Sequence, residues 1–214
     1  MPLHVSPAPA PALRSVLTAL GSPTALQEAR TPSLRAAQGP ATAELPLPVH
    51  VLDRGAPEGT ARTRFTSWRF LVRCGERALA AAETRLTADG WAFSHFFEGP
   101  YVGATEQALR EAELFSGLYQ PRLLSVPELY MLTLWLHGST GDDGSEGALE
   151  ASDVLIPLAP APPGIAAYLP HRVSDFLPAL RRRLTPTVAT APAAAPAAAT
   201  APTTQAPPLL GSPA

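Results

Sequence analysis

The chain has 214 residues, 26 of them proline, and a formal charge of −2 at pH 7. Without a basic excess, it is not expected to bind nucleic-acid phosphates or anionic lipid. Its single cysteine excludes an internal disulfide and any metal site built from several cysteines.

Codon usage explains part of the composition. All 16 basic residues are arginine, and the sequence contains neither Lys nor Asn. Folding imposes no such restriction, so we infer a GC-rich genome, of the kind found in bacteria. The longest strongly apolar run, residues 129–136, is too short to span a bilayer. No basic region precedes the first apolar patch, as a signal peptide requires, and we expect a cytoplasmic protein.

Prolines and aromatic residues divide the chain into three parts. Residues 1–60 carry ten prolines and residues 184–214 carry seven, whereas all 14 aromatic residues lie between Phe65 and Phe176. Aromatic side chains supply much of the area buried in a core. We therefore predict one domain over residues 61–183, a disordered Pro/Ala-rich segment before it, and a disordered Ala/Pro/Thr-rich tail after it.

The N-terminal segment contains one helical pattern. Residues 12–20 place Leu13, Val16, Leu17 and Leu20 on one face. Two interpretations remain open: a peptide that folds on a partner, or a transient helix in a tail, which is favoured because short isolated helices are marginal in water. A targeting peptide is a third alternative for this segment.

Three strands are predicted next. Residues 66–74 and 91–98 alternate between apolar and polar side chains, as half-buried strands do. Residues 78–86 suit a helix by composition. Because they lie between the turns at 75–76 and 89–90, we predict a strand.

The second half of the domain begins with a helix over residues 104–116, with its alanines along one stripe. Strands are predicted at 122–126, 129–136 and 154–158, and the second is apolar on both faces, which is typical of a central strand. A short helix capped by Ser174 or Asp175 ends the domain. The predicted fold is α+β, an antiparallel sheet of about five strands in the order β-β-β-α-β-β, with one helix packed on a face.

Cys74 is the candidate nucleophile, with His95 or His137 as its base, because a reactive thiolate needs an adjacent imidazole. Cys74 shares a face with apolar residues, so a core cysteine is the favoured interpretation. The histidines are interpreted in the same way, as hydrogen-bonded structural residues. The catalytic candidates are therefore weak.

A weak binding surface is predicted on residues 91–97, where four side chains alternate to one side: Trp91, Phe93, His95 and Phe97. The acidic loop at 138–152 lacks the ligand spacing of a calcium loop. No cofactor or metal is expected.

The leading hypothesis is a non-enzymatic protein-binding or assembly module, with a protein partner or self-association. One alternative is a small Cys/His-dependent hydrolase or transferase. The other is a small-ligand carrier that uses the aromatic sheet face as its pocket.

Overall fold

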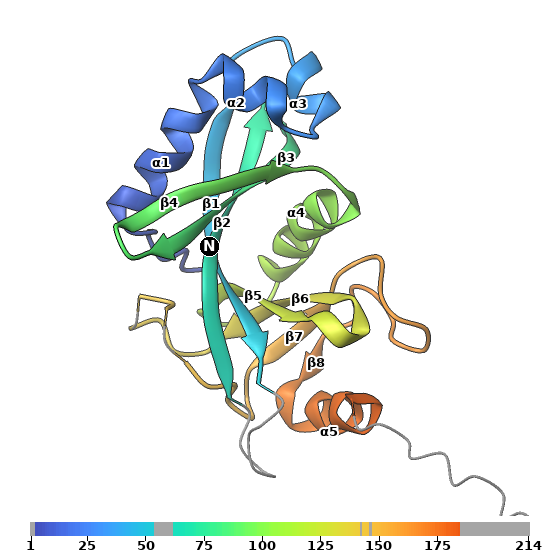
Figure 1. Cartoon of the computed structure of the whole chain (residues 1–214). Helices are drawn as coiled ribbons and strands as arrows, with labels where there is room; N and C mark the ends of the chain where they lie inside the picture. The colour runs from blue at the N-terminus through green and yellow to red at the C-terminus, as the bar shows by residue number, and fades with distance from the viewer. Residues whose placement is uncertain (1–2, 54–61, 142, 146, 185–214) are drawn as a thin grey trace, which may run out of the picture.

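The computed structural model describes residues 3–53, 62–141, 143–145 and 147–184 (Figure 1). The first half of the chain contains α1 (Ala10–Leu20), α2 (Pro23–Glu28), α3 (Pro32–Ala36), β1 (Thr42–Leu52), β2 (Thr63–Cys74), β3 (Arg77–Thr87) and β4 (Gly90–Phe97). The second half contains α4 (Pro100–Ala112), β5 (Gln120–Val126), the 3-10 helix η1 (Pro127–Leu129), β6 (Met131–His137), β7 (Val154–Pro157), β8 (His171–Arg172) and α5 (Val173–Leu184).

The eight strands form one mixed sheet in the order β4-β3-β2-β1-β5-β6-β7-β8. β1 pairs with β5 in parallel, and the other neighbours pair antiparallel. The predicted α+β class is confirmed, but the antiparallel sheet of about five strands is wrong. The sequence analysis missed β1, which supplies the parallel pair, and the two-residue strand β8.

β1 runs through the middle of the sheet although it contains two prolines. Pro46 lies in a register shift between Glu44 and Leu47, where β1 does not pair with β2. Pro48 pairs with β2 only, because the parallel ladder to β5 starts at Val49. Both prolines therefore occupy positions where a missing N–H is tolerated, which a rule based on composition does not reveal.

The predicted disorder of residues 1–60 does not hold for residues 3–53. α1 packs on the sheet of its own chain and buries Ala12, Val16 and Ala19 against it. Neither predicted interpretation of this helix, a transient element or a docking peptide, anticipated that contact. Residues 54–60 and most of the predicted C-terminal tail, from 185 onward, lie outside the described residues.

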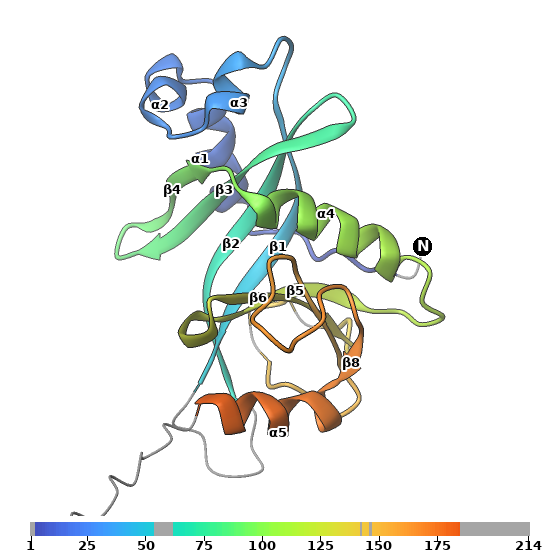
Figure 2. The same ribbon diagram turned by 90° about the vertical axis from the view of Figure 1, so that its right-hand side faces the viewer.

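Helices cover both faces of the sheet. Successive strand residues point to opposite faces, and Leu123 packs with α4 whereas Leu124 packs with α5. The face opposite α4 carries two clusters, one under α1 and α3 and one under α5. Figures 1 and 2 show α1 at one end of the sheet, α5 at the other and α4 across the strands.

Alanines let the helices lie close to the sheet. Ala80, Ala81 and Ala82 of β3 are all buried, and α4 buries Ala104 and Ala108 on the facing side. The predicted strand at 78–86 is confirmed as β3. The predicted helix at 104–116 is confirmed as α4, which begins directly after Gly99 and ends at Ala112, so both bounds lie four residues earlier than predicted.

The remaining predicted strands of the second half agree with the structure within a few residues. β6 is buried at every residue and lies between β5 and β7, as the apolar run 129–136 predicts, although Leu129 belongs to η1. The final helix is α5, which follows Arg172 directly and contains Pro178. Ser174 and Asp175 lie inside this helix, so the prediction that one of them caps it is wrong. The loop between β6 and β7, residues 138–153, returns over the sheet and carries part of the site described below.

Candidate functional site

The structure does not bring Cys74 together with either candidate histidine. Cys74 ends β2, where its Sγ lies 3.7 Å from the carbonyl oxygen of Gln38. On β3, the partners of Cys74 and His95 are six residues apart, which is about 20 Å along a strand. His137 is on β6, with β1 and β5 between it and β2.

The predicted aromatic surface on β4 is divided by a β-bulge. Phe93 pairs with Thr84 and His95 pairs with Glu83, so Ser94 is an extra residue in β4. A bulge reverses the side on which the following residues point, because side chains alternate with a period of two. The four residues of the predicted surface therefore do not share one face.

Each half of that set packs on a different side of the sheet. Trp91 and Phe93 join Phe96 in the cluster under α1. Phe97 packs in the cluster under α4, and the His95 ring lies 5.4 Å from the Phe97 ring. Sequence periodicity missed Phe96 as a member of the first set, because the bulge has no signal in the alternation itself.

A groove of about 700 Å³ follows the outer edge of β4. Residues 93–98 form one wall, and the other wall comes from α2 and the residues after it: Ala25, Glu28, Ala29 and Arg30. This volume is within the range of clefts that bind ligands. The groove combines phenylalanine side chains with the backbone edge of a terminal strand.

The far wall of the groove is attached to the sheet through Glu98. Its carboxylate accepts hydrogen bonds from Ser33 Oγ and from the backbone N–H of Leu34, both at 3.0 Å. These contacts fix the start of α3 next to the end of β4. The segment 25–30 is therefore held beside β4 from both ends, since α1 packs on the sheet before it.

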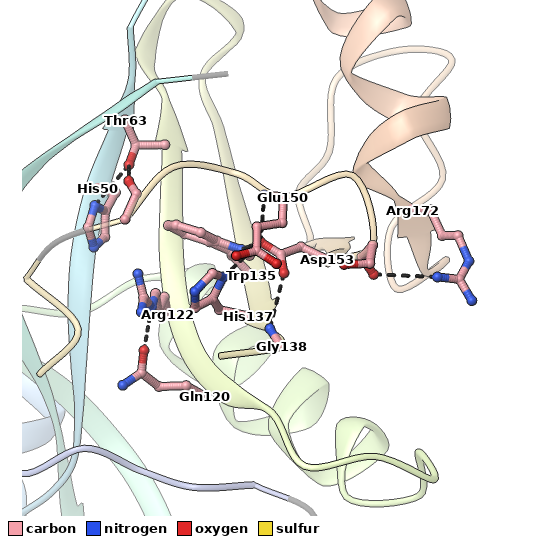
Figure 3. Close-up of polar contacts among 12 residues, drawn as sticks. His50, Thr63, Gln120, Arg122, Trp135, His137, Gly138, Glu150, Asp153 and Arg172 are labelled. Carbon is pink, nitrogen blue, oxygen red and sulfur yellow. Dashed lines mark hydrogen bonds and ion pairs between the residues drawn. The ribbon is translucent and has the colours of Figure 1, made fainter. Parts of the chain in front are cut away.

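A second cluster of polar side chains is buried under the loop 138–153 (Figure 3). Asp153 accepts hydrogen bonds from the Nε1 of Trp135 at 2.8 Å and the Nδ1 of His137 at 2.9 Å. It also accepts from the backbone N–H groups of Gly138 and Glu150, both at 3.0 Å. One carboxylate thus holds both ends of the loop.

Burial by itself would raise the pKa of Asp153, but its hydrogen bonds reverse the direction. The bonds from His137, Glu150, Gly138 and Trp135 together hold the pKa of this carboxyl below its ordinary value. Asp153 is therefore ionised in the folded protein at neutral pH. It orients His137 in the manner of an Asp–His pair, but the candidate nucleophile Cys74 lies elsewhere.

Four further side chains extend this cluster along the sheet. His50 of β1 contacts Thr63 and the loop, and its ring lies 5.2 Å from the Trp135 ring. The Arg122 guanidinium lies 4.8 Å from the centre of the Trp135 ring, and its Nε donates to Gln120. Among the described residues, no three acidic, His or Cys side chains gather as a metal site would require.

The sequence analysis missed His50, Arg122 and Asp153 as members of one cluster. His50 falls in the segment predicted to be disordered, and Arg122 and Asp153 were considered only as parts of a strand and an acidic loop. Arg122 could have been recognised, since it is the one charged residue in the strand at 120–126. Asp153 directly precedes a buried strand, which is the only sequence signal for its position.

Searches of protein-family models, of curated proteins and of solved structures found no match to this chain. Within the described part of the chain, none of the helices has the length and apolar character needed to cross a membrane.

Proposed function

We propose that this protein is a binding module that receives an extended segment of a partner protein in the groove beside β4. The observation that carries the proposal is the position of that groove, between a terminal strand and the segment 25–30. A terminal strand offers unpaired backbone groups to an incoming chain. Extended peptides commonly bind by adding to such an edge, with pockets that select their side chains.

The chemistry of β4 favours an uncharged, apolar segment. Residues 90–97 contain no charged side chain, and the groove exposes parts of Phe93 and Phe97. The charges lie at the rim, on Glu28, Arg30 and Glu98, and include both signs. A partner segment with alternating apolar side chains would bury those side chains against the phenylalanines. Because the segment is uncharged, it would bring no charge of the same sign close to the charges at the rim.

The wall formed by residues 25–30 favours the binding of a single extended segment over pairing with the sheet of a second copy of the chain. Exposed edges of natural sheets are usually protected, and here the Ser94 bulge and the segment 25–30 limit what can approach. An edge-to-edge dimer would need space for a complete second β4 and its own α2. We therefore place self-association through β4 second to capture of an isolated extended segment.

The experiment is a selection of displayed random peptides on the full chain, followed by measurement of Kd for the enriched peptides. The blocking variant is Ala29→Trp, which fills the groove from its far wall without changing the sheet. The matched control is Gln27→Trp, on an exposed position of α2. We expect enriched peptides with alternating apolar residues, and at least a tenfold higher Kd for Ala29→Trp only.

Two results would contradict the proposal. One is the absence of any enriched peptide, and the other is a peptide that binds the wild-type chain and the Ala29→Trp variant equally. A small molecule that competes with the enriched peptides would instead favour the ligand-carrier alternative at the same groove.

A further inference from the structure

The groove wall opposite β4 has little attachment of its own. No residue of α2 is buried, and Ala25, Leu26 and Ala29 are only half-buried against the cluster under α1. The segment is held at its two ends, by α1 before it and by α3 after it. α2 and α3 lie next to each other at one end of the sheet (Figure 2). The position of α3 therefore decides where one end of this wall stands.

The first turn of α3 is not capped by the residue that normally does so. Thr31 precedes α3 at the N-cap position, where a threonine hydroxyl commonly accepts a hydrogen bond from an N–H of the first turn. Here the Thr31 side chain makes no such bond. It is fully buried, and its Oγ1 has no hydrogen-bond partner in the part of the chain that the structure describes. The first N–H groups of α3 therefore need another acceptor.

Glu98 supplies that acceptor from the end of β4. Its Oε1 accepts from the backbone N–H of Leu34, the third residue of α3, and its Oε2 accepts from the Oγ of Ser33, both at 3.0 Å. The N–H of the third residue is one that a local cap would bind. A carboxylate also accepts more strongly than a neutral hydroxyl does. A residue 64 positions away from Leu34 thus replaces the local cap.

The same side chain belongs to the groove. Glu98 directly follows β4 and lines the groove beside Phe97. Its carboxylate therefore connects the end of one wall to the end of the other. The Leu34 side chain is 5% exposed and keeps α3 on the core. Glu98 adds what this apolar contact lacks, a fixed position for the start of α3 relative to β4.

We propose that Glu98 is the positioning residue of the groove: it caps α3 in place of Thr31 and thereby sets the distance between the segment 25–30 and β4. This inference rests on the proposed function, since that distance determines how well a partner segment fits. Both carboxylate oxygens of Glu98 bond to α3, so Glu98 acts on the partner through the wall and not through its charge.

Three variants of the full chain separate these roles. Glu98→Ala removes both hydrogen bonds. Glu98→Gln keeps them without the charge, because the amide oxygen accepts from the Leu34 N–H and the amide nitrogen donates to the Ser33 hydroxyl. Thr31→Val removes the buried hydroxyl and nearly preserves the shape of the side chain, so it is harmful only if Thr31 is the cap. Leu34 stays in the core in all three variants.

The first measurement needs no partner. Hydrogen exchange of the Leu34 amide, followed by NMR, reports whether its N–H is bonded. We expect exchange at least tenfold faster in Glu98→Ala, and within threefold of the wild type in Glu98→Gln and Thr31→Val. Exchange within threefold of the wild type in Glu98→Ala would overturn the proposal, as would faster exchange in Thr31→Val.

The second measurement is the Kd of the enriched peptides for the same variants. We expect Glu98→Ala to raise Kd at least fivefold, with Glu98→Gln and Thr31→Val within twofold of the wild type. Equal losses in Glu98→Ala and Glu98→Gln would mean that the charge acts on the peptide directly, which contradicts a positioning role. A selection that enriches no peptide contradicts the proposed function, whereas the exchange rates decide separately whether Glu98 caps α3.

Discussion

Trp135 and Trp68 each expose 1% or less of their surface, but only the indole N–H of Trp135 has a hydrogen-bond partner among the described residues. The Trp135 Nε1 donates to the ionised carboxylate of Asp153 at 2.8 Å. The Trp68 Nε1 is enclosed without an acceptor in the part of the chain that the structure describes. The two tryptophans of one sheet thus differ in whether the indole N–H is hydrogen-bonded.

Phenylalanine substitutions should reveal that difference. Trp135→Phe and Trp68→Phe remove the same atoms from equally buried sites, but only Trp135→Phe removes a hydrogen bond to a charged group. We expect Trp135→Phe to lower the free energy of unfolding by about 2 kcal/mol more than Trp68→Phe. Urea unfolding followed by circular dichroism measures both, and equal losses would show that the Asp153 contact adds nothing.

Asp153→Asn should lower stability by about 3 kcal/mol at neutral pH, because a buried acceptor of four hydrogen bonds becomes a partial donor. The loss should shrink in acid. The pKa of Asp153 is lowered in the folded state, so its contribution is present above the ordinary carboxyl pKa of 3.8 and is lost as the pH falls through the folded value.

The measurement for this prediction is the free energy of unfolding from pH 2 to pH 7. Wild-type and Asp153→Asn curves should converge at the acid end. Asp175→Asn, at an exposed position of α5, is the control and should follow the wild type throughout. Parallel curves for wild type and Asp153→Asn would contradict the assigned direction of the shift.

Deletion of Ser94 should leave the aromatic side chains of β4 on their present faces. Without the extra residue, Phe93 and His95 become neighbours in a regular ladder opposite Thr84 and Glu83, so Phe96 and Phe97 keep their partners on β3. A change of face would expose aromatic side chains at a cost of about 3 kcal/mol or more, and we expect the deletion to cost less than that. Thermal unfolding of the deletion variant and of Ser94→Gly, which keeps the bulge, compares the two directly.

Ala108→Leu should destabilise the protein by about 1–3 kcal/mol, because α4 has no space for a larger side chain against the sheet. Gln107→Leu, on the exposed side of the same helix, should change stability by less than about 0.5 kcal/mol. If Ala108→Leu were equally harmless, the close contact of α4 with the sheet would be wrong.

Several elements were predictable because local and tertiary preferences agree in them. The alternation in residues 66–74 and the apolar run at 129–136 gave strands that the structure contains as β2 and β6. The turn at Asp89–Gly90 outweighed helix-favouring composition and correctly made β3 a strand. In each case the pattern reflects which faces are buried.

Other features depend on contacts that sequence patterns do not encode. β1 was missed because Pro46 and Pro48 argue against a central strand, and only the pairing to β2 and β5 shows why they are tolerated. The bulge at Ser94 shifts the alternation of side chains between the two faces of the sheet, and the residues around it give no sign of that shift. The polar cluster joins His50 to Asp153, which are about a hundred positions apart in sequence.

The parallel pairing of β1 with β5 has a consequence for how the chain folds. β1 to β4 form a meander of sequential antiparallel neighbours, and β5 to β8 form another. The two meet through three residue pairs, from Val49↔Leu123 to Val51↔Ser125, whereas β1 and β2 share nine. Closing that junction joins segments more than seventy residues apart, an entropic cost that local hairpins avoid. We expect each meander to form early and the junction to form last, so it should also be the first seam to open in native-state hydrogen exchange.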